Sequence, residues 1–233
     1  MLGIPHNGNL SNGRMFEEQQ YDGKPLTNAW VEARARWEPV YELYQFKGLG
    51  ESHPRLSPTD EFAGGDIWDT GNLTGLPKQP SMYKTEYWRE ALKSGLRLQG
   101  TFGTNPFKYG AAAGTDTHTG LSAAEENNFW GKLKSSEPSP DRWDHLFQKE
   151  KSYVRKDWTL AAAGRMGVWA MANTREAIWD AMKRRETYAT TGPRITLRFF
   201  GGYDFGAADA QADRVVPAGY AKGVPMGGDL STA

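Results

Sequence analysis

Residues 111–120 read AAAGTDTHTG, a run of small residues that leads directly into Asp116 and His118 and ends in glycine. If residues 111–115 form a buried strand, side chains two positions apart point to the same side, so Asp116 and His118 leave its end together. A carboxylate oxygen and an imidazole nitrogen are ligands that suit Zn, Mn or Fe. The stretch therefore predicts a divalent transition-metal site at a strand end. It also fits a plain turn in which Asp116 caps the backbone and His118 faces water, because Asp-x-His is a common pattern.

A second polar segment lies near the N-terminus, where the short apolar run of residues 1–5 reaches His6. Asn7, Gly8 and Asn9 follow, a composition typical of a functional loop after a strand. We expect this loop to place His6 in a site, with Asn7 and Asn9 near the substrate or the metal ligands. A strand that starts at residue 1 has no upstream partner in the sequence, so it is either an edge strand or follows a segment that is absent.

A third polar segment follows residues 40–46 (VYELYQF), whose alternation and Tyr, Val and Phe content predict a strand. Val40, Glu42, Tyr44 and Phe46 share one side of it. Glu51 and His53 come just after this strand and again stand two positions apart. They are candidates for contacts to a ligand or substrate, and the alternative is a solvated loop.

Helices are predicted between these strands. Residues 27–37 are expected to be capped by Thr27 or Asn28, residues 81–96 to end at Gly95, and a further helix to run from a cap at Asn173 through residue 185. Residues 187–191 and 195–200 are expected to be strands, and residues 57–80 an irregular lid. This alternation indicates an α/β protein with its sites at the carboxyl ends of strands. His6, the Glu51/His53 loop and Asp116/His118 are then expected on one rim, which strengthens the metal hypothesis.

Composition excludes several classes of protein. The chain has 28 Lys and Arg against 28 Asp and Glu, so no basic field favours nucleic acid. Cys is absent, which removes disulfides and leaves the compartment undecided. No apolar run approaches the ~20 residues of a membrane span. With 12% aromatic residues and a mean hydropathy of −0.69, a soluble globular chain is expected.

Several segments together resemble a bacterial family of unknown function that is similar to the polymerase-and-histidinol-phosphatase (PHP) metallophosphoesterases. They cover nearly the whole chain in order: residues 4–9 (IPHNGN), 41–51 (YELYQFKGLGE), 105–108 (NPFK), 114–120 (GTDTHTG), 174–182 (TREAIWDAM) and 185–194 (RETYATTGPR). The resemblance is specific to the family. It is far less specific for a reaction.

The resemblance implies a partial, distorted PHP-like (β/α) barrel over residues 1–200, with long loops and a two- or three-metal cluster. His6, Asp116 and His118 match the family's metal ligands, and Glu51 falls in a loop where a ligand role is less certain. The family's opening His-x-His strand, a bridging Glu and another His are not found. Residues 201–233 are expected to be a Gly- and Ala-rich tail that begins a truncated β-rich region. The chain is therefore expected to be a C-terminal fragment with an incomplete metal site.

The function expected of the parent protein is metal-dependent hydrolysis of a small-molecule substrate, favouring a phosphoester attacked by metal-activated water. The fragment alone is expected to be weakly active or inactive, and to form homo-oligomers or to need a missing N-terminal half. The parent's localisation is open, and export is compatible with it. Amide or ester hydrolysis on the same metals stays open. So does a non-catalytic module that binds a carbohydrate or other polar ligand.

Overall fold

The computed structural model describes residues 1–120, 132–150, 153–160, 164–211 and 213–230. Its α-helices are α1 (Asn28–Trp37), α2 (Trp88–Phe102), α3 (Arg175–Lys183) and α4 (Val215–Lys222). The strands are β1 (Val40–Gln45), β2 (Gly48–Leu49), β3 (Gly110–Ala113), β4 (Leu146–Lys149), β5 (Val154–Lys156), β6 (Arg165–Val168), β7 (Thr187–Thr190), β8 (Phe200–Gly201) and β9 (Val224–Pro225). Short 3₁₀ helices span Gly8–Leu10, Pro80–Thr85, Lys134–Ser136, Arg142–Asp144, Asp157–Thr159 and Ala207–Ala210.

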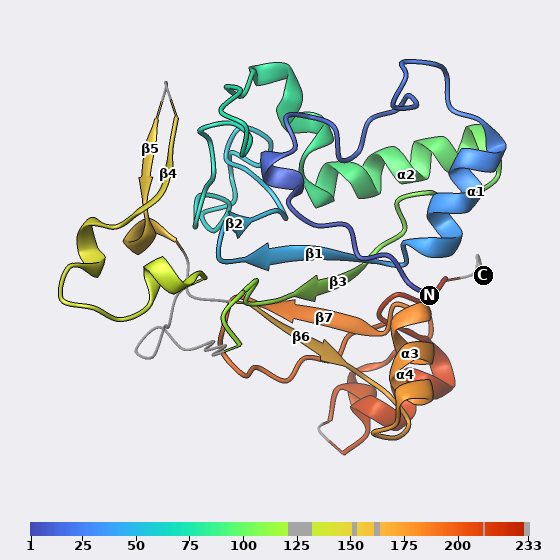
Figure 1. The fold of residues 1–233 in the computed structure, drawn as a ribbon. Coiled ribbons are helices and arrows are strands. Elements are labelled where there is room, and N and C mark those ends of the chain that lie inside the picture. The colour runs from blue at the N-terminus through green and yellow to red at the C-terminus, as the bar shows by residue number, and fades with distance from the viewer. Residues whose placement is uncertain (121–131, 151–152, 161–163, 212, 231–233) are drawn as a thin grey trace.

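The centre of the fold is a stack of short strands with helices on two sides (Figure 1). β1 pairs with β3 in parallel and with β2 in a tight antiparallel hairpin. β6 and β7 form an antiparallel pair that lies against β3. The Gly114 N–H donates to the Tyr44 carbonyl (3.1 Å), and the Gly164 N–H donates to the Gly114 carbonyl (3.1 Å), so backbone hydrogen bonds continue from β1 through β3 to the start of β6.

β1, β3 and β7 point the same way, whereas β6 runs opposite (Figure 1). Their carboxyl ends therefore meet at one side of the molecule, which we call the carboxyl edge: the residues that directly follow Gln45, Ala113 and Thr190. The coarse expectation of a chain that mixes helices and strands is confirmed, and β1 and β3 are a parallel pair, whereas the other paired strands are antiparallel. In the part of the chain that the structure describes, the strands form four small sheets and no closed barrel.

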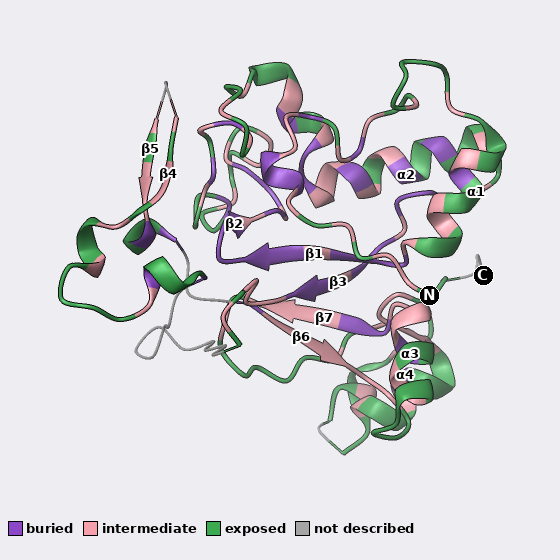
Figure 2. Cartoon of the chain, viewed as in Figure 1, coloured by how far each residue is buried: buried purple, intermediate pink, exposed green. Residues whose placement is uncertain are grey.

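Burial explains why β1 and β3 hold this central place. β1 and much of β3 are buried, and β6 is only partly so (Figure 2). An aromatic cluster packs β1 and β3 against α2, with ring pairs such as Phe16 and Tyr41 in edge-to-face contact at 5.1 Å. Its buried members are Phe16, Tyr41, Leu43, Ala91, Leu98, Phe107 and Tyr109. This cluster fixes the strand whose far end forms the site.

Threonine side chains start two of the predicted helices. Thr27 accepts a hydrogen bond from the Trp30 N–H (3.3 Å), which confirms the predicted start of α1. At α3 the cap is Thr174, which accepts from the Ala177 N–H (3.3 Å), so the predicted cap at Asn173 is wrong by one residue. Both helices then begin where an oxygen satisfies an otherwise unpaired backbone donor.

The largest error in a predicted helix concerns α2, which was expected over residues 81–96. Residues Pro80–Thr85 form a 3₁₀ helix instead, and α2 continues to Phe102, where Gly103 ends it with a φ of 73°. Gly95 does not end the helix, because it serves packing: a Cβ there would lie 2.2 Å from the Asn105 Oδ1. Asn105 in turn accepts from the Phe107 N–H (2.9 Å).

This contrast predicts opposite effects of two Gly→Ala changes in α2. Gly100→Ala is expected to stabilise the protein by about 0.5–1 kcal/mol, because alanine favours helix and no atom lies within 4 Å of the new methyl group. Gly95→Ala is expected to destabilise it by roughly 1–3 kcal/mol through the displaced Asn105 side chain. Urea unfolding of both variants measures this, and a stabilised Gly95→Ala would contradict the packing role.

Residues 201–233 were expected to begin a β-rich region, and their described part contains little strand. Residues after Gly201 contain the helix α4, and β8 and β9 contribute only two residues each. Pro217 stands in the first turn of α4, where its missing N–H costs no hydrogen bond, so it does not break the helix. Residues 195–199, expected to be a strand, have no regular structure. Among the described helices, none combines the length and the apolar character needed to cross a bilayer.

Candidate functional site

Asp116 lies at the carboxyl edge, three residues after β3, and is the centre of a charged cluster. Its Oδ2 is contacted by the ammonium groups of Lys47 and Lys132. Its Oδ1 lies 3.1 Å from the His118 Nε2. The predicted Asp116–His118 pair is therefore adjacent in space. Asp116 has a φ of 52°, a left-handed conformation that aspartate adopts more readily than most residues and that turns the chain sharply after the strand.

The two lysines were not among the expected site residues, and both are unusually buried. The side chain of Lys47 is 4% exposed and that of Lys132 is 9% exposed. Their ammonium groups lie 4.1 and 4.2 Å from the ring centroid of the buried Phe46, a cation–π arrangement. The Lys132 Nζ also lies 3.1 Å from the His118 Nε2. Buried ammonium groups need a countercharge, and Asp116 supplies it.

Asn7 and Asn9 position Lys47. Asn9 is buried, and its Nδ2 donates to the Lys47 carbonyl (3.1 Å). Asn7 accepts from the Gln45 Nε2 (2.7 Å), and the Gln45 Oε1 accepts from the Lys47 N–H (2.8 Å). The loop after His6 thus binds the turn between β1 and β2. We expected Asn7 and Asn9 near the substrate or the metal ligands. In the structure, their side chains contact this turn.

Competing effects set the charges of the cluster. Burial acts to raise the pKa of Asp116, but hydrogen bonds from Lys132 and Lys47 outweigh it and hold this pKa below its usual value. Burial lowers the pKa of the Lys47 ammonium to about 8, although Asp116 opposes the shift. Near neutral pH the Asp116 carboxylate is therefore ionised, and the Lys47 ammonium loses its proton as the pH rises through about 8.

Glu42 is a further site residue that the sequence analysis placed on a strand face without assigning it a role. A Cβ atom added to Gly114 would lie 3.2 Å from the Glu42 Oε1. The Glu42 carboxylate is therefore close to the backbone that leads to Asp116. Burial raises the pKa of Glu42, the nearby His6 and Lys47 charges oppose this, and the Asp116 charge reinforces it. In the sequence, the feature that marks Glu42 is a charged residue among aromatic and β-branched neighbours in a strand predicted to be buried.

His6 and Glu42 are the nearest additional candidates for metal ligands. His6 is exposed, its Nδ1 lies 3.3 Å from the Ile4 carbonyl oxygen, and its charge influences the Glu42 carboxyl. Across the residues that the structure describes, no group of three or more His, Cys, Asp or Glu side chains is arranged to hold a metal ion. Of the three residues expected to bind metal, Asp116 and His118 are in direct contact with each other.

Glu51 and His53 do not contact Asp116 or His118, and each has other partners among the described residues. Glu51 Oε1 accepts two hydrogen bonds from Arg89, at 2.9 and 2.7 Å. His53 is buried against the ring of Tyr83, with centroids 4.5 Å apart, and its Nε2 lies 3.1 Å from the Asp69 Oδ2. Both residues therefore hold the irregular segment of residues 51–87 together. They do not join the Asp116 cluster.

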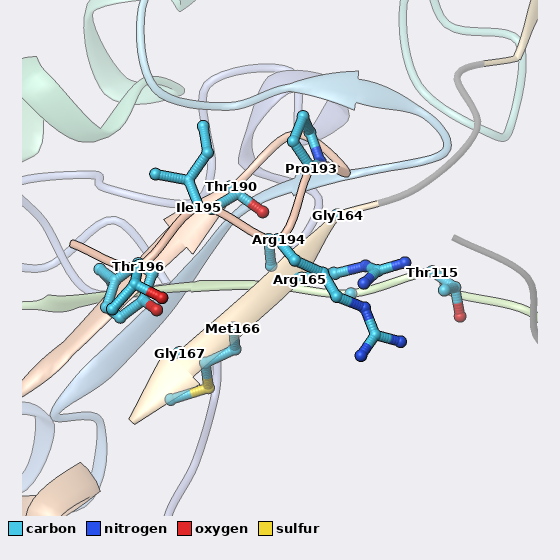
Figure 3. A pocket seen from close by; sticks show the side chains of 13 residues that line it. Thr115, Gly164, Arg165, Met166, Gly167, Thr190, Pro193, Arg194, Ile195 and Thr196 are labelled. Atoms are coloured by element: carbon cyan, nitrogen blue, oxygen red, sulfur yellow. The ribbon is translucent and has the colours of Figure 1, made fainter. Parts of the chain in front are cut away.

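A pocket of about 620 Å³ adjoins the cluster on the side of β6 and β7. Thr115, the neighbour of Asp116, forms part of its wall, and Arg165 and Arg194 extend toward that side (Figure 3). Arg165 begins β6, and Arg194 comes from the loop after β7. Nothing in the sequence pairs Arg194 with Arg165, because the two arginines lie in different segments of the chain.

The raised pKa of Glu42 predicts a pH-dependent effect of Glu42→Gln in metal-free protein. The wild-type carboxyl binds its proton more tightly when folded, so its stabilising contribution is present at low pH and is lost as the pH rises through the folded pKa. The Glu42→Gln variant has no carboxyl group at this position, so it does not lose stability in this way as the pH rises. The variant is expected to be more stable than wild type at pH 7, with the difference shrinking toward pH 4, as measured by urea unfolding. A difference that grows on acidification would contradict this electrostatic account.

Comparison with curated proteins and with solved structures gives no match. A family match, in contrast, covers residues 1–233, the whole chain, and its description is "Protein of unknown function (DUF3604)". The chain belongs to the DUF3604 family.

Proposed function

We propose that this chain carries part of the active site of a metal-dependent hydrolase that cleaves an anionic ester, with a phosphoester as the favoured substrate. The observation that supports it most is the contact between Asp116 and His118 at the carboxyl edge. An anionic carboxylate and an imidazole stand there side by side, next to buried lysines and to a pocket with two arginines. Such a combination suits a cation and an anionic substrate together.

The geometry of the pair fits one metal ion. Ligand atoms bonded to a metal at about 2.0–2.2 Å lie roughly 3 Å apart, and the His118 Nε2 and Asp116 Oδ1 are 3.1 Å apart. Glu42 and His6 are the candidates for further ligands. A bound divalent metal would polarise the ester and make a water molecule more acidic. Lys47 and Lys132 hold Asp116 ionised and would attract the anionic group of the substrate.

The proposal includes the expected relation to the PHP metallophosphoesterases. In it, β1, β3 and β7 are parallel strands of a distorted (β/α) barrel that other segments of a longer protein complete. The metal would be Zn, Mn or Fe. On this proposal, the chain by itself has low activity.

Hydrolysis of p-nitrophenyl phosphate tests the proposal. The assay uses the protein loaded with Zn²⁺, Mn²⁺ or Fe²⁺, the same protein after chelation, and the His118→Ala variant. The His118 side chain is 55% exposed, so we expect the variant to fold. We expect weak turnover that chelator and His118→Ala both reduce at least tenfold. Turnover that persists equally in chelator would contradict a metal-dependent reaction.

One observation favours a second candidate, a module that binds a polar ligand without turnover. The charge of Asp116 is already compensated by Lys47 and Lys132, so the cluster is stable without a metal. Ligand binding would then survive chelation, and no metal would be retained. The same metal-loaded and chelated samples therefore separate the two candidates.

A further inference from the structure

The ammonium group of Lys132 lies beside the two side chains that the proposed function assigns to a metal ion. It contacts the Asp116 Oδ2, it lies 3.1 Å from the His118 Nε2, and it donates to the Asp116 carbonyl at 3.2 Å. A carboxylate oxygen and an imidazole nitrogen that face the same positive charge are also the atoms that bind a divalent metal. Lys132 therefore supplies a cation at the place where the metal would bind.

A metal ion and this ammonium group need the same electrons on His118. In the tautomer that binds a metal, the Nε2 atom is unprotonated and accepts through a single lone pair in the plane of the ring. A zinc ion at about 2.0–2.1 Å from Nε2 takes that lone pair. The Lys132 Nζ, 3.1 Å from the same atom, then loses its acceptor, and two positive charges repel each other over a short distance. Metal binding therefore requires the Lys132 ammonium group to move.

Hydrogen bonds hold the backbone of Lys132, so the part that moves is the side chain. The Lys132 carbonyl accepts from the His118 N–H (2.8 Å), and the Lys132 N–H donates to the Ser136 Oγ (3.1 Å). The ammonium group lies 4.2 Å from the ring centroid of Phe46, and the side chain is 9% exposed. A lysine carries its charge on a flexible four-carbon stem, and rotation about the bonds of this stem moves the charge while the backbone stays in place.

We propose that Lys132 is an internal competitor for the metal: its ammonium group occupies the cation position beside Asp116 and His118 in the metal-free protein and is displaced when a divalent metal binds. The inference rests on the proposed function for the metal and deepens it by naming how the site is regulated. Of the two lysines described in this cluster, Lys132 is the one whose ammonium group lies within hydrogen-bonding distance of both side chains. The displaced group is one of the two that the proposed function gives to the anionic group of the substrate.

Calorimetric titration of the metal-free full chain with Zn²⁺ tests the competition. Lys132→Met keeps an apolar side chain against Phe46 and leaves Lys47 as the countercharge of Asp116, so we expect the variant to fold. It is expected to bind Zn²⁺ about 10- to 100-fold more tightly than wild type, because the metal no longer has to break a charged hydrogen bond. Lys132→Arg keeps a cation and is expected to bind no more tightly than wild type. Lys47→Met, the matched control, removes the other ammonium group and is expected to gain less than Lys132→Met.

The displacement itself is measured by the reactivity of the Lys132 amine. The chain is acetylated with an N-hydroxysuccinimide ester in the presence and in the absence of Zn²⁺, and mass spectrometry of its peptides gives the extent at each lysine. Lys24, whose side chain is 73% exposed, is the internal standard. We expect Lys132 to react slowly in the metal-free protein, because its ammonium group is buried and ion-paired, and several-fold faster relative to Lys24 once Zn²⁺ is bound.

The outcomes separate this inference from the proposed function. Equal Zn²⁺ affinity in wild type and Lys132→Met, or acetylation of Lys132 that is the same with and without bound Zn²⁺, would overturn the competition and leave the hydrolase in place. Tighter binding by Lys132→Met without any metal-dependent hydrolysis of p-nitrophenyl phosphate would support the competition and remove the hydrolase. Zn²⁺ binding by none of the samples would overturn both.

Discussion

Lys78→Met is expected to lower the free energy of unfolding by about 3–5 kcal/mol, because it leaves a buried carboxylate without its countercharge. The side chains of Lys78 and Glu86 are 1% and 0% exposed, and the Nζ lies 3.0 Å from the Glu86 Oε2. The same ammonium group donates to the carbonyls of Asn9 (2.7 Å) and Trp68 (2.9 Å). Its loss would therefore loosen both loops that it joins, including the one that supports Lys47. Urea unfolding at pH 7 measures the change.

Two further variants make this prediction specific. Lys24→Met removes an ion pair with Asp22 whose side chains are 73% and 51% exposed, and it is expected to leave the free energy of unfolding nearly unchanged. Burial raises the pKa of Glu86, and Lys78 opposes the shift. Lys78→Met/Glu86→Gln, which removes the unpaired charge, is therefore expected to recover part of the loss. Equal effects of Lys78→Met and Lys24→Met would show that the buried pair does not hold these loops.

Asp116→Asn is expected to destabilise the metal-free protein by a similar amount, about 3–5 kcal/mol at pH 6, because two buried ammonium groups then face each other without a carboxylate. Lys47 and Lys132 both contact the Asp116 Oδ2. The loss should shrink above pH 8, since the pKa of Lys47 is already lowered to about 8 and falls further without Asp116. Unfolding titrations at pH 6 and pH 9 measure both parts.

Asp141→Asn is the matched control for this change. Asp141 is also an aspartate beside a histidine, with its Oδ2 3.4 Å from the His145 Nε2, but its side chain is 75% exposed. Its replacement is expected to leave stability nearly unchanged at either pH, because solvent screens an exposed ion pair. If Asp116→Asn were as mild as this control, Lys47 and Lys132 would not depend on Asp116 for their burial.

The elements that the sequence predicted well are those fixed by local rules. Residues 40–46 are rich in Tyr, Val and Phe, which favour strands, and Thr27 caps a helix within its own turn. Asp116 and His118 stand two residues apart, so their proximity needs little from the rest of the fold. The parallel arrangement of β1 and β3 also followed from a helix predicted between them.

The parts that were missed depend on contacts between distant segments. Lys47 and Lys132 stand 85 positions apart in the chain and look like ordinary surface lysines, yet Phe46 and Asp116 bring them together in the interior. His53 has the spacing of a ligand but is drawn into the core by Tyr83 and Asp69. No local pattern states which partner a polar side chain will meet.

Elemental analysis of metal bound per chain tests the central claim most directly. The samples are wild type, His118→Ala and His145→Ala, purified without a metal-affinity tag and dialysed against Zn²⁺, Mn²⁺ or Fe²⁺. His145 is the matched control, because it lies beside Asp141 and not beside Asp116, with its Nε2 3.4 Å from the Asp141 Oδ2. The account predicts bound metal in wild type and in His145→Ala, and its loss in His118→Ala. Equal metal content in wild type and His118→Ala, or none in wild type, would contradict a metal site at the end of β3.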